Sequence, residues 1–349
     1  MTPRRLVALF ATGVLVIGLA AWVATRDPYG PRASIAGTPV LPGLEKSLNS
    51  VTEVRIVKAG KVGATLEKHG DGWVVAERGY PADFRRLRRL LLDLGSLKAI
   101  ERKTRLAANY PLLGVEDVSQ PKATGSEVEV IAPGRTWSII VGDSSDANSG
   151  YVRVAGSRQS LLASPLLRVD AKPSLWLDPV VIDVKQDRVR EIDEQPAKGP
   201  RYSVSRAGKG QVDLTVRGIP RGRELSGPDA ADTMANALSN LTLDDVAKAG
   251  SAPHAADLSH AVFRTFDGLE IDVSGWQSDK KHFIELTARG TGARAAAEAR
   301  RIEARANGWD YEIPGYRYSE IFQPLEGLLK PLPKPHKAAR HPVRAKKAG

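Results

Sequence analysis

The sequence contains no cysteine and only six histidines among its 349 residues. The absence of cysteine excludes disulfide scaffolds, thiol nucleophiles, iron–sulfur clusters and cysteine-bound zinc. His254 and His260 are six positions apart and His282 is distant, so the histidines do not have the spacing of a zinc-binding helix. We therefore expect no metal site.

Short catalytic and nucleotide-binding motifs are missing as well: G-x-S-x-G, G-x-x-x-x-G-K-[ST] and G-x-G-x-x-G do not occur. Two adjacent carboxylate pairs, Glu116–Asp117 and Asp244–Asp245, are poor acid/base candidates because neighbouring side chains seldom converge on one substrate bond. The stretch Asp143–Gly150 is rich in oxygen ligands but lacks the spacing of a calcium loop, so we interpret it as a polar turn. We expect no catalytic residue and no cofactor, and hence that the protein is not an enzyme.

The net charge of +11 is concentrated at one end of the chain. Residues 330–349 contain seven basic residues and no acidic one, which leaves +4 on the other 329 residues. These basic residues are Lys330, Lys334, Lys337, Arg340, Arg344, Lys346 and Lys347. No aromatic residue lies among them to stack on bases, so we expect a disordered basic tail and no nucleic-acid partner.

Long uncharged runs are also rare, with one exception at the N-terminus. Leu6–Thr25 is twenty residues without a charge, preceded by Arg4 and Arg5. A helix of that length spans roughly 30 Å, so the run predicts a transmembrane anchor with residues 1–5 in the cytoplasm. A cleaved signal peptide is the alternative. On either interpretation residues 26–349 are exported, and the anchored form would be a single-pass protein of the bacterial inner membrane with a periplasmic body.

A linker and two similar segments follow. Residues 26–43 contain four prolines and three glycines, which predicts an extended spacer. Residues 44–180 show three short strand patterns, a helix beginning at Pro81, and further strands. We expect Phe84, Leu87, Leu91 and Leu94 to form the buried face of that helix.

The same order recurs in residues 181–329. A second helix is predicted from Pro228, with Ala231, Met234, Leu238 and Leu241 on its apolar face. A shift of 147 residues carries Pro81 onto Pro228. These patterns predict an α+β fold of two tandem β-β-β-α-β-β-β repeats with antiparallel sheets, preceded by one N-terminal transmembrane helix.

Four arginines, Arg85, Arg86, Arg88 and Arg89, are predicted on the polar face of the first helix. Either this is an ordinary solvated face, or it is an interaction surface for lipid headgroups or an acidic partner. The equivalent helix of the second copy carries acids instead: Asp229, Asp232, Asp244 and Asp245. The two copies would then present opposite charge to their partners.

Several short motifs resemble the domain-of-unknown-function 4340 family. They are Asp71–Val75, Tyr80–Asp83 at the start of the leucine-rich helix, Val141–Gly142 and Gly150–Arg153. The resemblance implies no catalytic activity. Members of that family resemble membrane-anchored extracytoplasmic companions of gliding-motility-type ABC transporters, which implies a permease and an ATPase as partners.

Two functions remain open from the sequence. The first is a non-catalytic, membrane-anchored accessory or docking subunit of an ABC-transporter-like envelope complex. The second is a periplasmic binding module that holds an envelope ligand (a glycan, a lipid or a peptide) in a cleft between the two repeats.

Overall fold

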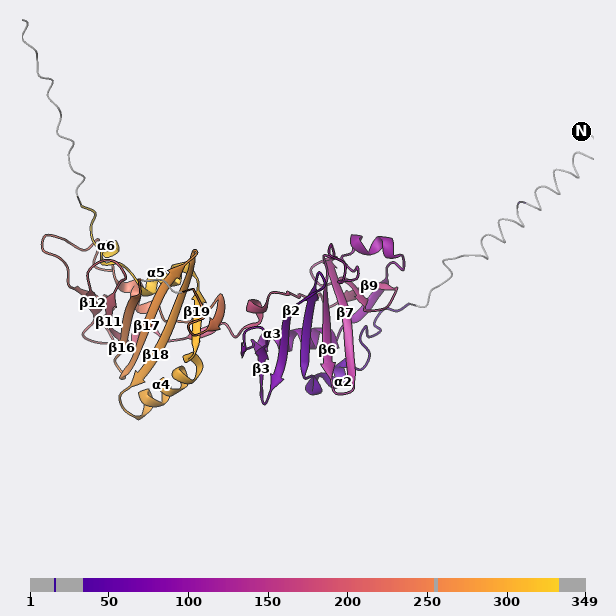
Figure 1. The fold of residues 1–349 in the computed structure, drawn as a ribbon, viewed down its shortest axis with the longest axis horizontal. Helices are drawn as coiled ribbons and strands as arrows, with labels where there is room; N and C mark the ends of the chain where they lie inside the picture. Colours follow the sequence, from indigo (N-terminus) through magenta and orange to yellow (C-terminus); the bar gives the residue numbers. More distant parts are fainter. Residues whose placement is uncertain (1–15, 17–33, 254–256, 333–349) are drawn as a thin grey trace, which may run out of the picture. The chain divides into compact units, whose positions relative to one another are not determined.

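The computed structural model describes Val16, residues 34–253 and residues 257–332 (Figure 1). The chain divides into two compact units. Unit 1 comprises Met1–Lys68 and Arg85–Ala171, and unit 2 comprises His69–Phe84 and Lys172–Gly349. The backbone therefore passes from one unit to the other at three points.

Unit 1 is built on antiparallel strands in the order β2-β1-β6-β7-β8-β9-β5. The strands are β1 (Glu53–Lys58), β2 (Lys61–His69), β5 (Lys98–Arg102), β6 (Ser126–Ala132), β7 (Arg135–Ser144), β8 (Gly150–Val154) and β9 (Ser160–Ser164). The helical elements are α2 (Leu44–Ser47), η1 (Leu48–Ser50), α3 (Phe84–Gly95) and η2 (Ala107–Leu112). Strand β6 shows the underlying pattern, since its residues alternate between buried and half-buried positions.

Helix α3 buries a stripe of leucines at i, i+3, i+4 and i+7: Leu87, Leu90, Leu91 and Leu94. Phe84, predicted on this face, is instead 55% exposed. It is the first residue of the helix, and helical side chains point toward the N-terminus, so its ring extends beyond the packed turns. The helix also begins later than predicted, because Pro81 belongs to a strand.

Part of the predicted spacer is packed onto unit 1. The backbone of Gly37–Val40 runs along the outer edge of β5, with hydrogen bonds of 2.9 Å from Gly37 N to Ala99 O and from Val40 N to Leu97 O. Val40 and Leu41 are buried. The apolar residues among the prolines thus cover a strand edge that would otherwise be open. Residues 26–33 of the spacer and the basic tail from residue 333 onward lie outside the described residues.

Unit 2 contains a second antiparallel sheet in the order β13-β12-β11-β16-β17-β18-β19-β15, and a separate pair, β10-β14. Its strands are β3 (Gly72–Val75), β4 (Tyr80–Pro81), β10 (Val180–Ile182), β11 (Val189–Gln195), β12 (Tyr202–Ser205), β13 (Thr215–Arg217), β14 (Leu241–Thr242), β15 (Asp245–Lys248), β16 (Ser259–Thr265), β17 (Leu269–Ser278), β18 (Lys281–Gly290) and β19 (Trp309–Ile313). The helical elements are η3 (Pro173–Trp176), η4 (Gln186–Arg188), η5 (Asp232–Asn236), α4 (Ala293–Ala306), α5 (Gly315–Ile321) and α6 (Leu325–Leu328). Helix α4 follows β18 in the second sheet (Figure 1). The two elements pack so closely that a Cβ on Gly290 would lie 2.2 Å from the Ala295 backbone.

The β3–β4 hairpin continues the strand order of the first sheet, as β4-β3-β2, while its contacts group it with unit 2. Tyr80 is completely buried, with its ring edge-on to Trp309 at 5.1 Å and to Tyr311 at 6.1 Å. The backbone of Asp83 donates to Trp176 O at 2.7 Å, and that of Asp178 donates to Pro81 O at 2.9 Å. The buried ring of Tyr80 and these two backbone hydrogen bonds hold the hairpin against unit 2.

The predicted fold, two tandem β-β-β-α-β-β-β repeats preceded by a transmembrane helix, is wrong. The segment predicted as a helix from Pro228 contains only the short 3₁₀ turn η5. The long helix of unit 2 is α4, which lies between β18 and β19 in the chain. Antiparallel sheet dominates, although the mixture of helices and strands agrees with an α+β chain. Within the described part of the chain, no helix is long and apolar enough to cross a membrane. The segment predicted to do so, residues 6–25, lies outside that part except for Val16.

The apolar residues of the incorrect helix are nevertheless buried. Ala231, Met234, Leu238 and Leu241 are all at most 1% exposed. Asn240 adopts a left-handed conformation (φ 47°) and Leu241 enters strand β14, so the backbone cannot continue as a helix. The spacing of apolar residues identified a buried segment correctly but gave it the wrong secondary structure.

Candidate functional site

The four arginines predicted as an interaction surface separate into two groups on α3. Arg85, Arg88 and Arg89 are exposed, whereas Arg86 is half-buried and lines a cavity. The three exposed arginines and Leu92 follow the i, i+3, i+4, i+7 spacing, so they form one stripe along the helix. Leu92 is 48% exposed. We call Arg85, Arg88, Arg89 and Leu92 the arginine stripe.

The acidic helix face predicted for the second copy is absent, because its residues do not lie on one helix. They are Asp229, Asp232, Asp244 and Asp245. Asp232 accepts a hydrogen bond from the Leu214 backbone at 2.9 Å, and Asp245 lies on strand β15 in an ion pair with Arg78. These side chains have separate structural partners because the predicted helix is absent. The expected contrast of charge between two equivalent helices is therefore wrong.

The polar loop between β7 and β8 is held by its own side chains. Asp146 accepts hydrogen bonds from the backbone of Asn148 at 2.7 Å and of Ser149 at 2.9 Å, and also from the Ser149 hydroxyl. The hydrogen bond from that hydroxyl, followed by the backbone bonds, lowers the pKa of Asp146. Among the residues that the structure describes, no group of three or more potential metal ligands occurs.

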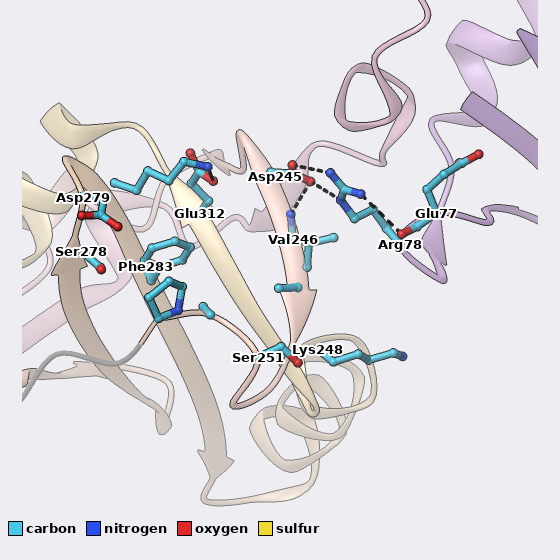
Figure 2. A pocket seen from close by; sticks show the side chains of 14 residues that line it. Glu77, Arg78, Asp245, Val246, Lys248, Ser251, Ser278, Asp279, Phe283 and Glu312 are labelled. Atoms are coloured by element: carbon cyan, nitrogen blue, oxygen red, sulfur yellow. Dashed lines mark hydrogen bonds and ion pairs between the residues drawn. The ribbon is translucent and has the colours of Figure 1, made fainter. Parts of the chain in front are cut away.

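A cavity of about 530 Å³ lies in unit 2, beside the edge strand β15 (Figure 2). Its walls come from the β3–β4 hairpin, from β15 and β19, and from the turn between β17 and β18. Phe283, Val246, Ala252 and Pro253 supply its apolar lining. The Phe283 ring stacks on Trp276 at 5.7 Å, so this side of the cavity rests on a packed aromatic pair.

Two ion pairs line this cavity. Arg78 reaches from the hairpin to Asp245 and binds it with both arms, at 2.7 Å (Nε–Oδ1) and 2.8 Å (Nη2–Oδ2) (Figure 2). Lys281 Nζ lies 2.7 Å from Glu312 Oε2. Burial opposes ionisation of Asp245, but hydrogen bonds from Arg78 and from the Val246 backbone outweigh it and keep its pKa below the ordinary value.

The other charged side chains of this cavity complete a mixed surface. Lys248 lies over the Trp309 ring, with Nζ 3.7 Å from the centroid. Asp279 lies on the tight β17–β18 turn, where it adopts a left-handed conformation. Charges of both signs around an apolar lining can hold a ligand that has an apolar part and polar groups of either sign.

A buried carboxyl group elsewhere in unit 2 was missed by the sequence analysis. Glu194 is 2% exposed, and both of its oxygens lack a hydrogen-bond partner among the described residues. Burial raises its pKa to about 9, so the carboxyl is neutral at pH 7. The alternation along β11 contained the signal, because Glu194 follows Ile192 by two positions and so faces the same core.

Comparison with known proteins gives one match. The family model "Domain of unknown function (DUF4340)" matches residues 47–261, more than half of the chain. The match covers most of unit 1 and extends to β16 of unit 2. No curated protein and no solved structure is significantly similar to this chain. The motifs around Trp73, Tyr80 and Gly142 thus lie within a family-wide match, and the chain belongs to the DUF4340 family.

Proposed function

We propose that the protein is a non-catalytic docking protein of the bacterial cell envelope. In this proposal the arginine stripe of α3 contacts an acidic surface on a membrane complex. The observation that supports it most directly is the composition of the stripe: three exposed arginines and a half-exposed leucine on one helix face.

Arginine combined with exposed apolar surface is typical of protein interfaces. Arginine is enriched in interfaces because its planar guanidinium group binds carboxylates with two hydrogen bonds and also packs against apolar groups. Leu92 adds apolar surface beside the three guanidinium groups. The buried leucines on the opposite side of α3 hold the stripe on a rigid element, so little entropy is lost when a partner binds.

The proposed location and partner have a separate basis. The uncharged run Leu6–Thr25 behind two arginines supports export of the body of the chain. Resemblance to companions of gliding-motility-type ABC transporters supports a permease and its ATPase as the complex.

The test is affinity purification of the full-length protein from its own membranes in mild detergent. Wild-type protein should recover a polytopic permease and an ATPase in near-equal amounts. The variant Arg85→Glu/Arg88→Glu/Arg89→Glu should lose both. The matched control, Arg294→Glu/Arg300→Glu/Arg301→Glu on α4, makes the same change of charge at exposed positions of unit 2 and should retain both. Recovery of the complex by the stripe variant would refute docking through α3.

A second candidate function is binding of an envelope ligand, and the cavity beside β15 favours it. Its size of about 530 Å³ lies within the range of roughly 300–1,000 Å³ common for ligand pockets. Introduction of a bulky side chain at Ala252 (Ala252→Phe) would fill it from the lining. If the cavity binds a ligand that co-purifies with the protein, native mass spectrometry should detect added mass on the wild type and none on this variant.

A further inference from the structure

Three cations from three separate elements of unit 1 line one small cavity. The cavity has a volume of about 300 Å³. Lys58 lies at the end of β1, Arg86 on α3, and Arg168 on the segment after β9. Their positions in the sequence are far apart, so the fold brings them together.

Two glycines in the wall of this cavity, Gly125 and Gly142, lie very close to the backbone of Leu113 and Gly114. A Cβ on Gly125 would lie 2.2 Å from Gly114 O, and one on Gly142 would lie 2.1 Å from Leu113 O. Both positions therefore require glycine, because the chain at Leu113–Gly114 packs directly on the strand ends. The wall cannot move without displacing that packing, and it gives the cavity a fixed shape.

The balance of charge in the cavity is positive. Asp143 and Asp170 also line it, so the formal charge of the five ionisable side chains is +1. Arg86 and Asp170 have interactions within the protein. Lys58 and Arg168 are exposed, and neither forms an ion pair with any residue that the structure describes. Two cations thus remain to receive an anion, beside one carboxylate, that of Asp143, which abuts Gly114.

The geometry points to a binding site for a phosphate group, held by Lys58 and Arg168 beside the positive charge of Arg86. A phosphate dianion presents several oxygens in different directions, which suits donors that approach from separate elements. Arginine binds such oxygens in pairs, and lysine adds a point charge. The small volume and polar lining admit the phosphate group and leave any larger attached body outside the cavity. Free phosphate and a phosphomonoester lipid headgroup both present this group.

This site is distinct from the arginine stripe. Arg86 lines the cavity, whereas Arg85, Arg88 and Arg89 are the exposed arginines of the same helix. Variants at Lys58 and Arg168 leave α3 untouched, so failure of one proposal can be separated from failure of the other.

The experiment uses the full-length protein and two probes. Inorganic phosphate is titrated calorimetrically, and co-sedimentation is measured with phosphatidylcholine vesicles that contain or lack phosphatidic acid. The test variant is Lys58→Ala/Arg168→Ala, and the matched control is Lys61→Ala/Arg105→Ala, which removes two exposed cations that lie outside both the cavity and the arginine stripe. Circular dichroism establishes that each variant is folded.

Wild type and control should bind phosphate with the same affinity, and the test variant should bind at least tenfold more weakly. Binding to phosphatidic acid vesicles but not to inorganic phosphate, lost in the test variant alone, supports the site and identifies a lipid headgroup as the source. Binding to free phosphate alone supports the site with a soluble source. The proposal is overturned if wild type binds neither probe, or if test variant and control bind equally.

Discussion

A buried arginine of unit 1 and a buried glutamate of unit 2 differ in whether the protein supplies their hydrogen-bond partners. In unit 1, Arg153 is 4% exposed, but its Nε donates to Val115 O at 2.7 Å, its Nη1 donates to Ser157 O at 3.0 Å, and its guanidinium lies 4.7 Å from the Tyr110 ring centroid. In unit 2, Arg206 follows the same rule, with Nε 2.7 Å from Val189 O. Glu194 does not, because nothing described satisfies its oxygens.

The difference shows that burial alone does not determine the charge of a group. Arg153 donates to carbonyl oxygens inside unit 1, whereas burial without donors raises the pKa of Glu194 to about 9. Unit 2 should therefore carry a pH dependence at Glu194. The predictions below test this contrast, from the largest expected effect on stability to the smallest.

The largest effect is expected from Glu194→Gln as pH changes. The unfolded chain ionises this group above about 4.5, while the folded chain keeps it protonated up to about 9. The folded state therefore binds the extra proton, and wild-type stability contributed by this group falls as pH rises between those values, by roughly 1.4 kcal/mol per pH unit. Between pH 5 and pH 8 the free energy of unfolding of wild type should drop by about 4 kcal/mol more than that of the variant. Urea unfolding at both pH values measures the free energies of unfolding. An equal drop in wild type and variant would contradict the prediction.

Arg153→Ala should be the next most destabilising change. It leaves Val115 O and Ser157 O without their donor and removes the contact with Tyr110, at an expected cost of about 2–4 kcal/mol. The exposed Arg105→Ala in the same unit should change stability by less than about 0.5 kcal/mol. Urea unfolding compares the two. Equal losses at Arg153 and Arg105 would show that the buried hydrogen bonds of Arg153 add nothing to stability.

A smaller effect is expected from Arg78→Ala. Its side chain and that of Asp245 are 31% and 22% exposed, and the pair is bidentate, so its loss should cost about 1–2 kcal/mol. Lys281→Ala breaks the other ion pair of the same cavity, but Lys281 is 55% exposed, so its cost should stay below about 0.5 kcal/mol. Limited proteolysis should cut the hairpin near Gly79 sooner in the arginine variant than in the lysine variant. Equal cleavage would show that Tyr80 alone retains the hairpin.

The smallest effect on stability is expected from Arg85→Glu/Arg88→Glu/Arg89→Glu. These side chains are exposed, so the change should lie within about 0.5 kcal/mol per position. Thermal unfolding monitored by circular dichroism provides the measurement. A large loss of stability would assign the arginines a structural role and remove the basis of the docking test.

Strands with clear alternation were predictable from sequence. Apolar and polar residues alternate along the sequences of β6 and β19, and helix α4 is Ala-rich, so the type of each of these elements follows from the sequence. Short edge strands such as β5 and β15 were missed, because they carry few apolar residues and their pairing partners are distant in the sequence.

The candidate sites were less predictable than the elements. The arginine stripe could be found because its residues are adjacent and follow helical spacing. The phosphate cavity and the cavity beside β15 could not, since each collects residues from elements that only the fold brings together. Burial of Glu194 could be predicted only by assuming that a glutamate occupies an inward-facing strand position, although glutamates are usually exposed.

The position of the β3–β4 hairpin has a consequence for the order in which the protein is made. Arg78 is separated from Asp245 by 167 residues, a stretch that a ribosome needs about 8–33 s to translate at roughly 5–20 residues per second. Throughout that interval Tyr80 lacks both of its aromatic neighbours, Trp309 and Tyr311. A single cut at Ala171 would make this condition permanent, because the first fragment would retain Tyr80 and the second would contain the two rings that cover it. A fragment that carries unit 2 should therefore have residues 69–84 fused ahead of Lys172.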